Sequence, residues 1–140
     1  MMDDFYVKKE LLFQEVDFVG HSGDKLHWKI EMDALTHAEW KCIARMIMER
    51  EVRPFQSAIG IPRGGVTLGT LLNEHSTQNK NDPYLIVDDV LTTGGSFEHF
   101  TNQYFRNREP NYFGWTVFAR NQPPSWVRSL FQMPQKNNFD

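Results

Sequence analysis

The chain has a single cysteine and no long apolar run, and each shortage excludes a class of protein. Cys42 is the only cysteine, so no internal disulfide can form and a reducing compartment is expected. No apolar run reaches the roughly 18 residues that a membrane span requires. Residues 1–4 are Met-Met-Asp-Asp, which lack the basic start of a secretory signal. We therefore expect a cytoplasmic protein without a membrane partner.

Long basic runs are also missing. The chain has 15 Lys and Arg residues against 18 Asp and Glu residues, a net charge of −3. Nonspecific nucleic-acid binding needs a basic surface, so we do not expect a nucleic-acid partner. A small anionic ligand stays open, because backbone amides and a helix N-terminus can hold a phosphate without net positive charge.

The residues that are present have the composition and patterning of one globular domain. Hydrophobic residues make up 40% and charged residues 24% of the 140 positions, which suits a single core. Apolar strands alternate with helices, which predicts an α/β fold with a mostly parallel sheet. The expected strands are 55–61, 84–88 and 113–119, and the expected helices are 37–51, 66–72, a helix from about 96, and a short last helix over 126–133.

The most informative stretch is 84–96, Tyr-Leu-Ile-Val-Asp-Asp-Val-Leu-Thr-Thr-Gly-Gly-Ser. Asp88 and Asp89 follow a buried strand, where adjacent carboxylates repel each other unless a cation or sugar hydroxyls balance them. The run after them has hydroxyls, glycines and a helix N-terminus, which suit a phosphate. It consists of Thr92, Thr93, Gly94, Gly95 and Ser96. The stretch therefore predicts a sugar-phosphate site.

A second glycine-rich turn, Pro62-Arg63-Gly64-Gly65, follows the preceding expected strand. Ligands of parallel α/β sheets bind beyond the C-terminal ends of the strands. We therefore expect the two turns to meet in one crevice.

These two segments resemble the type I phosphoribosyltransferases. Residues 84–96 are similar to the family's phosphoribosyl pyrophosphate (PRPP) signature over its whole length, and 60–65 resemble its pyrophosphate loop. The resemblance implies a cis peptide bond between Pro62 and Arg63. It also implies one phosphoribosyltransferase-like domain over 1–140, with a small N-terminal hood of about 1–35 and a core of about 36–133.

The flanks resemble the orotate branch of that family. Residues 18–30 are similar to the hood that covers the base, and Arg120 follows a strand where orotate enzymes place an arginine. The resemblance implies that Arg120, His21 and Trp28 contact the base. His21 stands where such enzymes often carry a lysine, so the acceptor base is left open.

The resemblance also implies a role for each part of the site. Asp88 and Asp89 would be the catalytic residues, holding the ribose hydroxyls directly or through Mg²⁺. Residues 92–96 would bind the 5-phosphate, and Pro62, Arg63, Gly64 and Gly65 the pyrophosphate. The implied activity is Mg²⁺-dependent transfer of ribose 5-phosphate between PRPP and a nucleobase, in a homodimer.

One segment departs from the family pattern. Type I enzymes carry a long flexible loop before the signature strand, whereas only residues 73–83 are present here, with His75 and Lys80 as its cation candidates. The short loop keeps a noncatalytic PRPP- or nucleotide-binding protein open as an alternative. An Asp pair after a strand also suits Mg²⁺-dependent phosphoryl transfer, as in a phosphatase or a receiver domain.

Overall fold

The computed structural model describes residues 11–19, 25–106 and 108–134. The chain divides into two compact units, Met1–Glu39 and Trp40–Asp140. Each unit is described by itself below. The expected arrangement of one domain with a hood and a core stays a prediction.

The first unit is built on a two-stranded antiparallel sheet. Strands β1 (Phe13–Val19) and β2 (Lys25–Ile30) pair from Phe13 with Ile30 to Val19 with Lys25, and the register shifts between Glu15 and Phe18. A short 3-10 helix, η1 (Met32–Ala34), follows. Strand β2 lies within the segment 18–30 that resembles the hood, and β1 begins before that segment, at Phe13.

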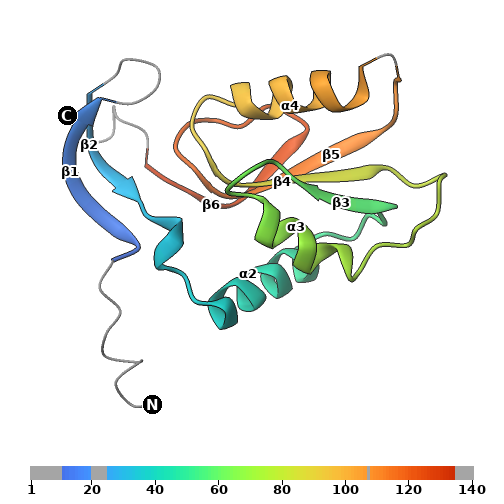
Figure 1. Ribbon diagram of the computed structural model, residues 1–140, viewed down its shortest axis with the longest axis horizontal. Helices are drawn as coiled ribbons and strands as arrows, with labels where there is room; N and C mark the ends of the chain where they lie inside the picture. The colour runs from blue at the N-terminus through green and yellow to red at the C-terminus, as the bar shows by residue number, and fades with distance from the viewer. Residues whose placement is uncertain (1–10, 20–24, 107, 135–140) are drawn as a thin grey trace. The chain divides into compact units, whose positions relative to one another are not determined.

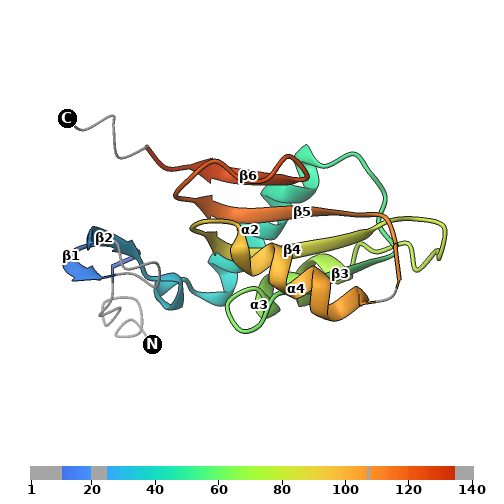
Figure 2. The ribbon, with the colours of Figure 1, turned by 90° about the horizontal axis from the view of Figure 1, so that it is seen from above.

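The second unit contains a four-stranded parallel sheet in the order β3, β4, β5, β6 (Figure 2). Helix α4 covers one face, and α2 and α3 lie on the other (Figure 1). The predicted parallel α/β fold is confirmed. In the described part of the chain, no helix is long and apolar enough to cross a membrane. The bounds are β3 Ser57–Gly60, β4 Tyr84–Leu91, β5 Tyr112–Ala119, β6 Val127–Gln132, α2 His37–Arg50, α3 Val66–Asn73 and α4 Gly95–Phe105.

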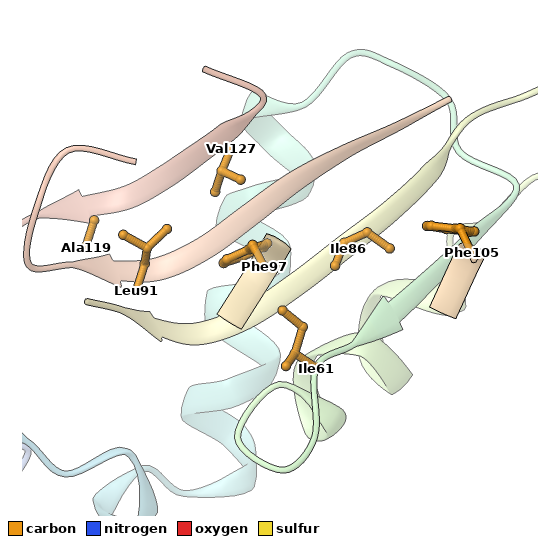
Figure 3. Close-up of a cluster of buried hydrophobic side chains, with 7 residues drawn as sticks. All are labelled: Ile61, Ile86, Leu91, Phe97, Phe105, Ala119 and Val127. Carbon is orange, nitrogen blue, oxygen red and sulfur yellow. The ribbon is translucent and has the colours of Figure 1, made fainter. Parts of the chain in front are cut away.

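The core of this unit lies on both faces of the sheet. Under α4, Ile86 and Phe97 are fully buried in a cluster with five other apolar side chains (Figure 3). Leu85 and Val87 are also fully buried, and they point to the opposite face because side chains alternate along a strand. Burial on both faces explains why residues 84–87 read as a continuous apolar run.

The last expected helix is wrong, because residues 127–132 form strand β6. Val127 and Leu130 are both buried, three residues apart, which is also a helical spacing. A strand places them on opposite faces of the sheet, so the pattern alone did not distinguish the two structures. Pairing with β5, from Gly114 with Val127 to Ala119 with Gln132, decides in favour of the strand.

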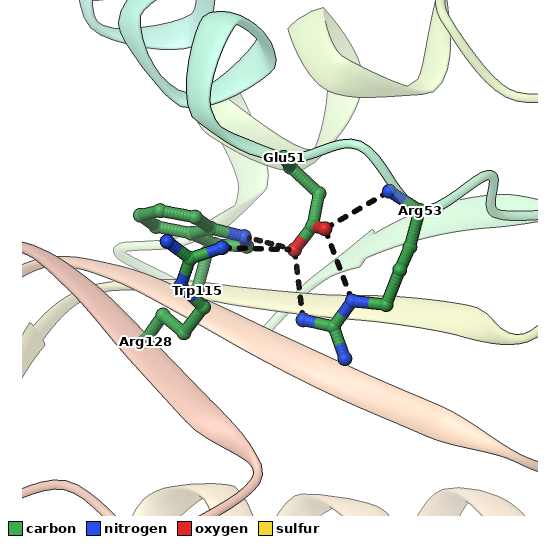
Figure 4. Close-up of polar contacts among 4 residues, drawn as sticks. All are labelled: Glu51, Arg53, Trp115 and Arg128. Atoms are coloured by element: carbon green, nitrogen blue, oxygen red, sulfur yellow. Dashed lines mark hydrogen bonds and ion pairs between the residues drawn. The ribbon is translucent and has the colours of Figure 1, made fainter.

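A buried carboxylate joins the end of α2 to the sheet (Figure 4). Glu51, with a side chain only 1% exposed, accepts hydrogen bonds from Arg53 Nη2 at 2.8 Å and Trp115 Nε1 at 2.8 Å. Arg128 Nη1 lies 3.9 Å away. Burial raises the pKa of Glu51, but the hydrogen bonds from Arg53 and Trp115 outweigh that effect and lower it to about 2. The carboxylate is therefore ionised and fully partnered.

Candidate functional site

The two glycine-rich turns follow the neighbouring strands β3 and β4, and the first turn packs against the second strand. That the two turns meet in one crevice stays a prediction. The backbone N–H of Ile61 donates to Val87 O at 2.8 Å. A Cβ atom at Gly64 would overlap the carboxylate of Asp89, and one at Gly65 would lie 2.5 Å from Val87 O. The backbone of the turn therefore packs directly against the acidic pair, which only glycine allows at these two positions.

The pyrophosphate-loop candidate, residues 60–65, presents its tip to solvent. Pro62, Arg63 and Gly64 are exposed, whereas Gly65 is buried. The Pro62–Arg63 peptide bond is cis, as the resemblance implies. The loop closes through hydrogen bonds from Gly65 N to Ile61 O and from Val66 N to Arg63 O, and α3 begins at Val66.

The acidic pair lies inside β4, since the strand continues to Leu91 instead of ending at residue 88. Asp88 is 7% exposed. Burial raises its pKa well above the usual range, and the charge of Asp89 and a hydrogen bond with it act in the same direction. Asp88 Oδ1 accepts from Asp89 N at 2.9 Å, and Asp89 Oδ1 accepts from Val90 N at 2.7 Å. Such a pair favours protons or a cation in the site.

The donor set fits Mg²⁺ held together with a substrate. Among the described residues, no group of three or more His, Cys, Asp or Glu side chains could hold a metal ion. Mg²⁺ commonly takes one or two protein carboxylates and completes its shell with phosphate oxygens and water. Asp88 and Asp89 supply such a pair.

Residues 92–96, here called the phosphate loop, lead into α4. Gly94 has φ of 87°, the left-handed region that glycine adopts without a steric cost. Helix α4 begins at Gly95, so its N-terminal amides and the positive end of its dipole lie at the loop. Thr92, Thr93, Gly95 and Ser96 are exposed. The loop can therefore hold an anion through backbone amides and hydroxyls.

Arg120 lies at the same edge of the sheet, directly after β5. Its backbone N–H donates to Leu91 O at 2.8 Å, next to the phosphate loop. The side chain is half-buried, and burial lowers its pKa. The structure thus brings together three predicted parts of the site, namely the acidic pair with 62–65, the phosphate loop, and Arg120.

The two other predicted base contacts, His21 and Trp28, fall in the first unit. His21 lies outside the described residues. Trp28 lies on β2 in the first unit, where its backbone pairs with Glu15. Their role at the base stays a prediction.

Three residues that were not predicted support the site from β5 and the turn after it. Thr116 Oγ1 donates to Asp89 O at 3.2 Å, and Asn121 Nδ2 donates to Thr92 O at 2.6 Å. Pro124 packs against Gly94. Pairing of Asp88 with Thr116 brings this segment beside the site. The only sequence signal for these three residues was that the strands β4 and β5 both precede polar turns.

The loop between α3 and β4 lies at the opposite end of the sheet. Thr77 N donates to Phe55 O at 2.8 Å, and Gln56 Nε2 donates to Asp82 O at 2.8 Å. Phe55 and Gln56 precede β3, whose four residues span roughly 13 Å up to the pyrophosphate-loop candidate. Lys80 is therefore held away from the acidic pair.

Comparison with solved structures shows the fold. The chain matches an orotate phosphoribosyltransferase from Aeropyrum pernix with a TM-score of 0.70 and 17% identity, over 87% of this chain and 88% of that chain. It matches the Mycobacterium tuberculosis H37Rv orotate phosphoribosyltransferase in complex with PRPP with a TM-score of 0.64 and 17% identity, over 84% of this chain and 88% of that chain. A Leishmania donovani UMP synthase matches with a TM-score of 0.70 and 13% identity, over 87% of this chain and 34% of that longer chain.

Comparisons of the sequence itself give a different result. No protein-family model and no curated protein matches it. The fold is nevertheless that of the type I phosphoribosyltransferases, in the form found in orotate phosphoribosyltransferases. The predicted resemblance is thus confirmed for the fold.

Proposed function

We propose that this chain is a Mg²⁺-dependent phosphoribosyltransferase, which transfers ribose 5-phosphate between PRPP and a nucleobase and releases pyrophosphate. The observation that carries the proposal is the packing of the Asp89 carboxylate against Gly64. The acidic pair thus lies beside one glycine-rich turn and precedes the other on the same strand, which supports binding of the diphosphate, ribose and 5-phosphate of PRPP in that order.

Each turn has a separate task in this proposal. Arg63 and the backbone amide of Gly64 hold the pyrophosphate group, whereas the amide of Gly65 already donates to Ile61 O. The phosphate loop and the N-terminus of α4 hold the 5-phosphate. When bound, Mg²⁺ would neutralise charge on the departing pyrophosphate, and Asp88 and Asp89 would be the residues that hold it.

The acids also act on the sugar. The bond from the ribose C1 to the pyrophosphate oxygen breaks, and a bond from C1 to a ring nitrogen of the base forms, with loss of the proton on that nitrogen. The ribose ring gains positive charge as the first bond breaks. Negative charge from Asp89, and from Asp88 when a bound cation keeps it ionised, would stabilise that charge. The reaction needs no protein nucleophile.

The acceptor base is proposed only as a chemical class. Arg120 at the end of β5 suits an acceptor with an anionic or carbonyl group, as in an orotate-like pyrimidine or another nucleobase. His21 and Trp28 are proposed as further base contacts from the first unit. A cytoplasmic homodimer completes the proposal, and sedimentation velocity would test the oligomeric state.

The direct test incubates the protein with PRPP, Mg²⁺ and a panel of pyrimidine and purine bases, and measures pyrophosphate release. We expect release above the protein-free control with at least one base, and loss of that release in Asp89→Asn. Release equal to the control with every base would count against the enzyme.

The position of the loop 73–83 favours a second candidate, a noncatalytic PRPP- or nucleotide-binding regulatory protein. Because this loop is held by hydrogen bonds to residues 55 and 56, it cannot exclude water from the site or bring a cation to it. Calorimetry would then show PRPP binding without turnover. Absence of binding at millimolar PRPP would contradict both candidates, and full PRPP affinity in Asp88→Asn would favour phosphoryl transfer instead.

A further inference from the structure

We propose that Asn121 is a positioning residue that holds the phosphate loop in its anion-binding shape. The inference rests on the proposed function, because it assigns the 5-phosphate to that loop. Asn121 Nδ2 donates to the carbonyl of Thr92, the first residue of the loop, at 2.6 Å. A carbonyl oxygen only accepts, so the amide nitrogen of Asn121 must face it.

The phosphate loop has weak internal support. The hydrogen bonds described within it and into α4, from Gly95 N to Thr93 Oγ1 and from Glu98 N to Gly94 O, are both 3.3 Å long. All of its residues except Gly94 are exposed. A glycine-rich exposed segment has much conformational freedom to lose on binding a ligand. Its shape therefore depends on contacts from outside.

Those contacts come from the turn after β5. Besides the bond from Asn121, the ring of Pro124 lies against Gly94, with its Cγ atom 3.1 Å from the place of a Cβ at that position. The two contacts fall on the first and third residues of the loop. They fix the loop on the side that faces the neighbouring strand.

The turn after β5 is itself held to the sheet by hydrogen bonds, so it can restrict the motion of the phosphate loop. Arg120 N donates to Leu91 O and Met133 N donates to Ala119 O, both at 2.8 Å. Gln132 Nε2 donates to Ala119 O at 3.1 Å. Asn121 thus connects a fixed strand end to an otherwise loosely held loop, and a ligand that binds the preformed loop loses less ordering entropy.

The pyrophosphate-loop candidate is held by different groups. Its contacts are Val87 O, through Ile61 N, and the Asp89 carboxylate, against Gly64. Loss of the Asn121 side chain should therefore weaken a ligand of the phosphate loop and spare a ligand of residues 60–65. A general loss of stability would weaken both.

The experiment compares ribose 5-phosphate with pyrophosphate, each titrated calorimetrically in the presence of Mg²⁺. In Asn121→Ala, the dissociation constant for ribose 5-phosphate should rise about fivefold, the effect of one typical hydrogen bond. The constant for pyrophosphate should stay within about twofold. Gln122→Ala, at the exposed neighbouring position, is the matched control and should bind both ligands like the wild type. Asn121→Ser, whose hydroxyl is too short to reach Thr92 O, should repeat the result of the alanine variant and replaces it if that variant does not fold.

Each contrary outcome is distinct. Unchanged ribose 5-phosphate affinity in both Asn121 variants, or an equal loss for the two ligands, would overturn the positioning role while the proposed function stands. A wild-type protein that binds neither ligand at millimolar concentration would overturn the proposed function and this inference with it.

Discussion

Asp88 is in surroundings that oppose its ionisation. Asp88 is buried beside a second carboxylate, and both effects raise its pKa. The backbone of Gly64 in the opposing turn lies against the Asp89 carboxylate, with no side chain of its own to intervene. The turn therefore leaves little room for an added protein atom beside the Asp89 carboxylate.

Gly64→Ala tests this close approach. The added methyl group would overlap the Asp89 carboxylate, so either the carboxylate or the turn must move. Because the position is exposed, we expect little change in melting temperature but at least a tenfold loss of PRPP affinity by calorimetry. Thr67→Ala, at an exposed position on α3, is the control, and wild-type affinity in Gly64→Ala would contradict the packing described here.

Helices and strands in the second unit are joined by one charged cluster as well as by apolar contacts. Glu51 follows α2 and accepts from Trp115 on β5, and its partner Arg53 lies over the ring of Phe113 with Cζ 3.9 Å from the centroid. Arg128 on β6 lies over Trp115, 4.7 Å from its centroid. The cluster fixes the end of α2 against two strands.

The cluster predicts a pH dependence of stability. The folded-state pKa of Glu51 is about 2, below its ordinary value of 4.5, so its contribution is complete above about pH 4.5 and is lost as the pH falls towards 2. Between pH 6 and pH 3 the wild type should lose about 2 kcal/mol more unfolding free energy than Glu51→Gln, which does not titrate. Urea titrations at the two pH values measure this. Equal losses in the two proteins would show that Glu51 is not held ionised by its neighbours.

The arrangement of the second unit separates the site from the loop 73–83. The acidic pair, the phosphate loop and Arg120 lie at the C-terminal ends of the strands, and the loop is bonded to residues before β3. In the family pattern the corresponding loop supplies cations. Here Arg63 is the cation that the described structure places at the pyrophosphate-loop candidate.

Two alanine variants test this separation. Lys80→Ala should leave pyrophosphate affinity within about twofold of the wild type, because Lys80 lies on the remote loop. Arg63→Ala should weaken it about tenfold or more, the effect of losing one charge-assisted contact. Calorimetry with pyrophosphate and Mg²⁺ measures both. A loss of tenfold in Lys80→Ala would show that the loop reaches the site.

Much of this fold was predictable from local patterns, and the failures have physical causes. The helix expected over 37–51 has strong periodicity and is found over 37–50, and the strand expected over 84–88 has a long apolar run and is found over 84–91. The strand β3 is shorter than expected and only half-buried, because it lies at the edge of the sheet. The segment 127–132 was wrongly predicted as a helix. Its strand buries Val127 on one face of the sheet and Leu130 on the other, and two buried residues three positions apart also fit a helix.

The sequence alone determined the chemical character of the site. Adjacent acids after an apolar run, and glycines where backbone must approach closely, are local requirements that a short segment carries in itself. The tertiary structure decided which segments lie together. Asn121 contacts Thr92 across 29 positions only because β4 and β5 are neighbours in the sheet. Likewise, the loop 73–83 is excluded from the site only because its hydrogen bonds go to the start of β3. No local pattern contains either fact, since both depend on contacts between distant parts of the chain.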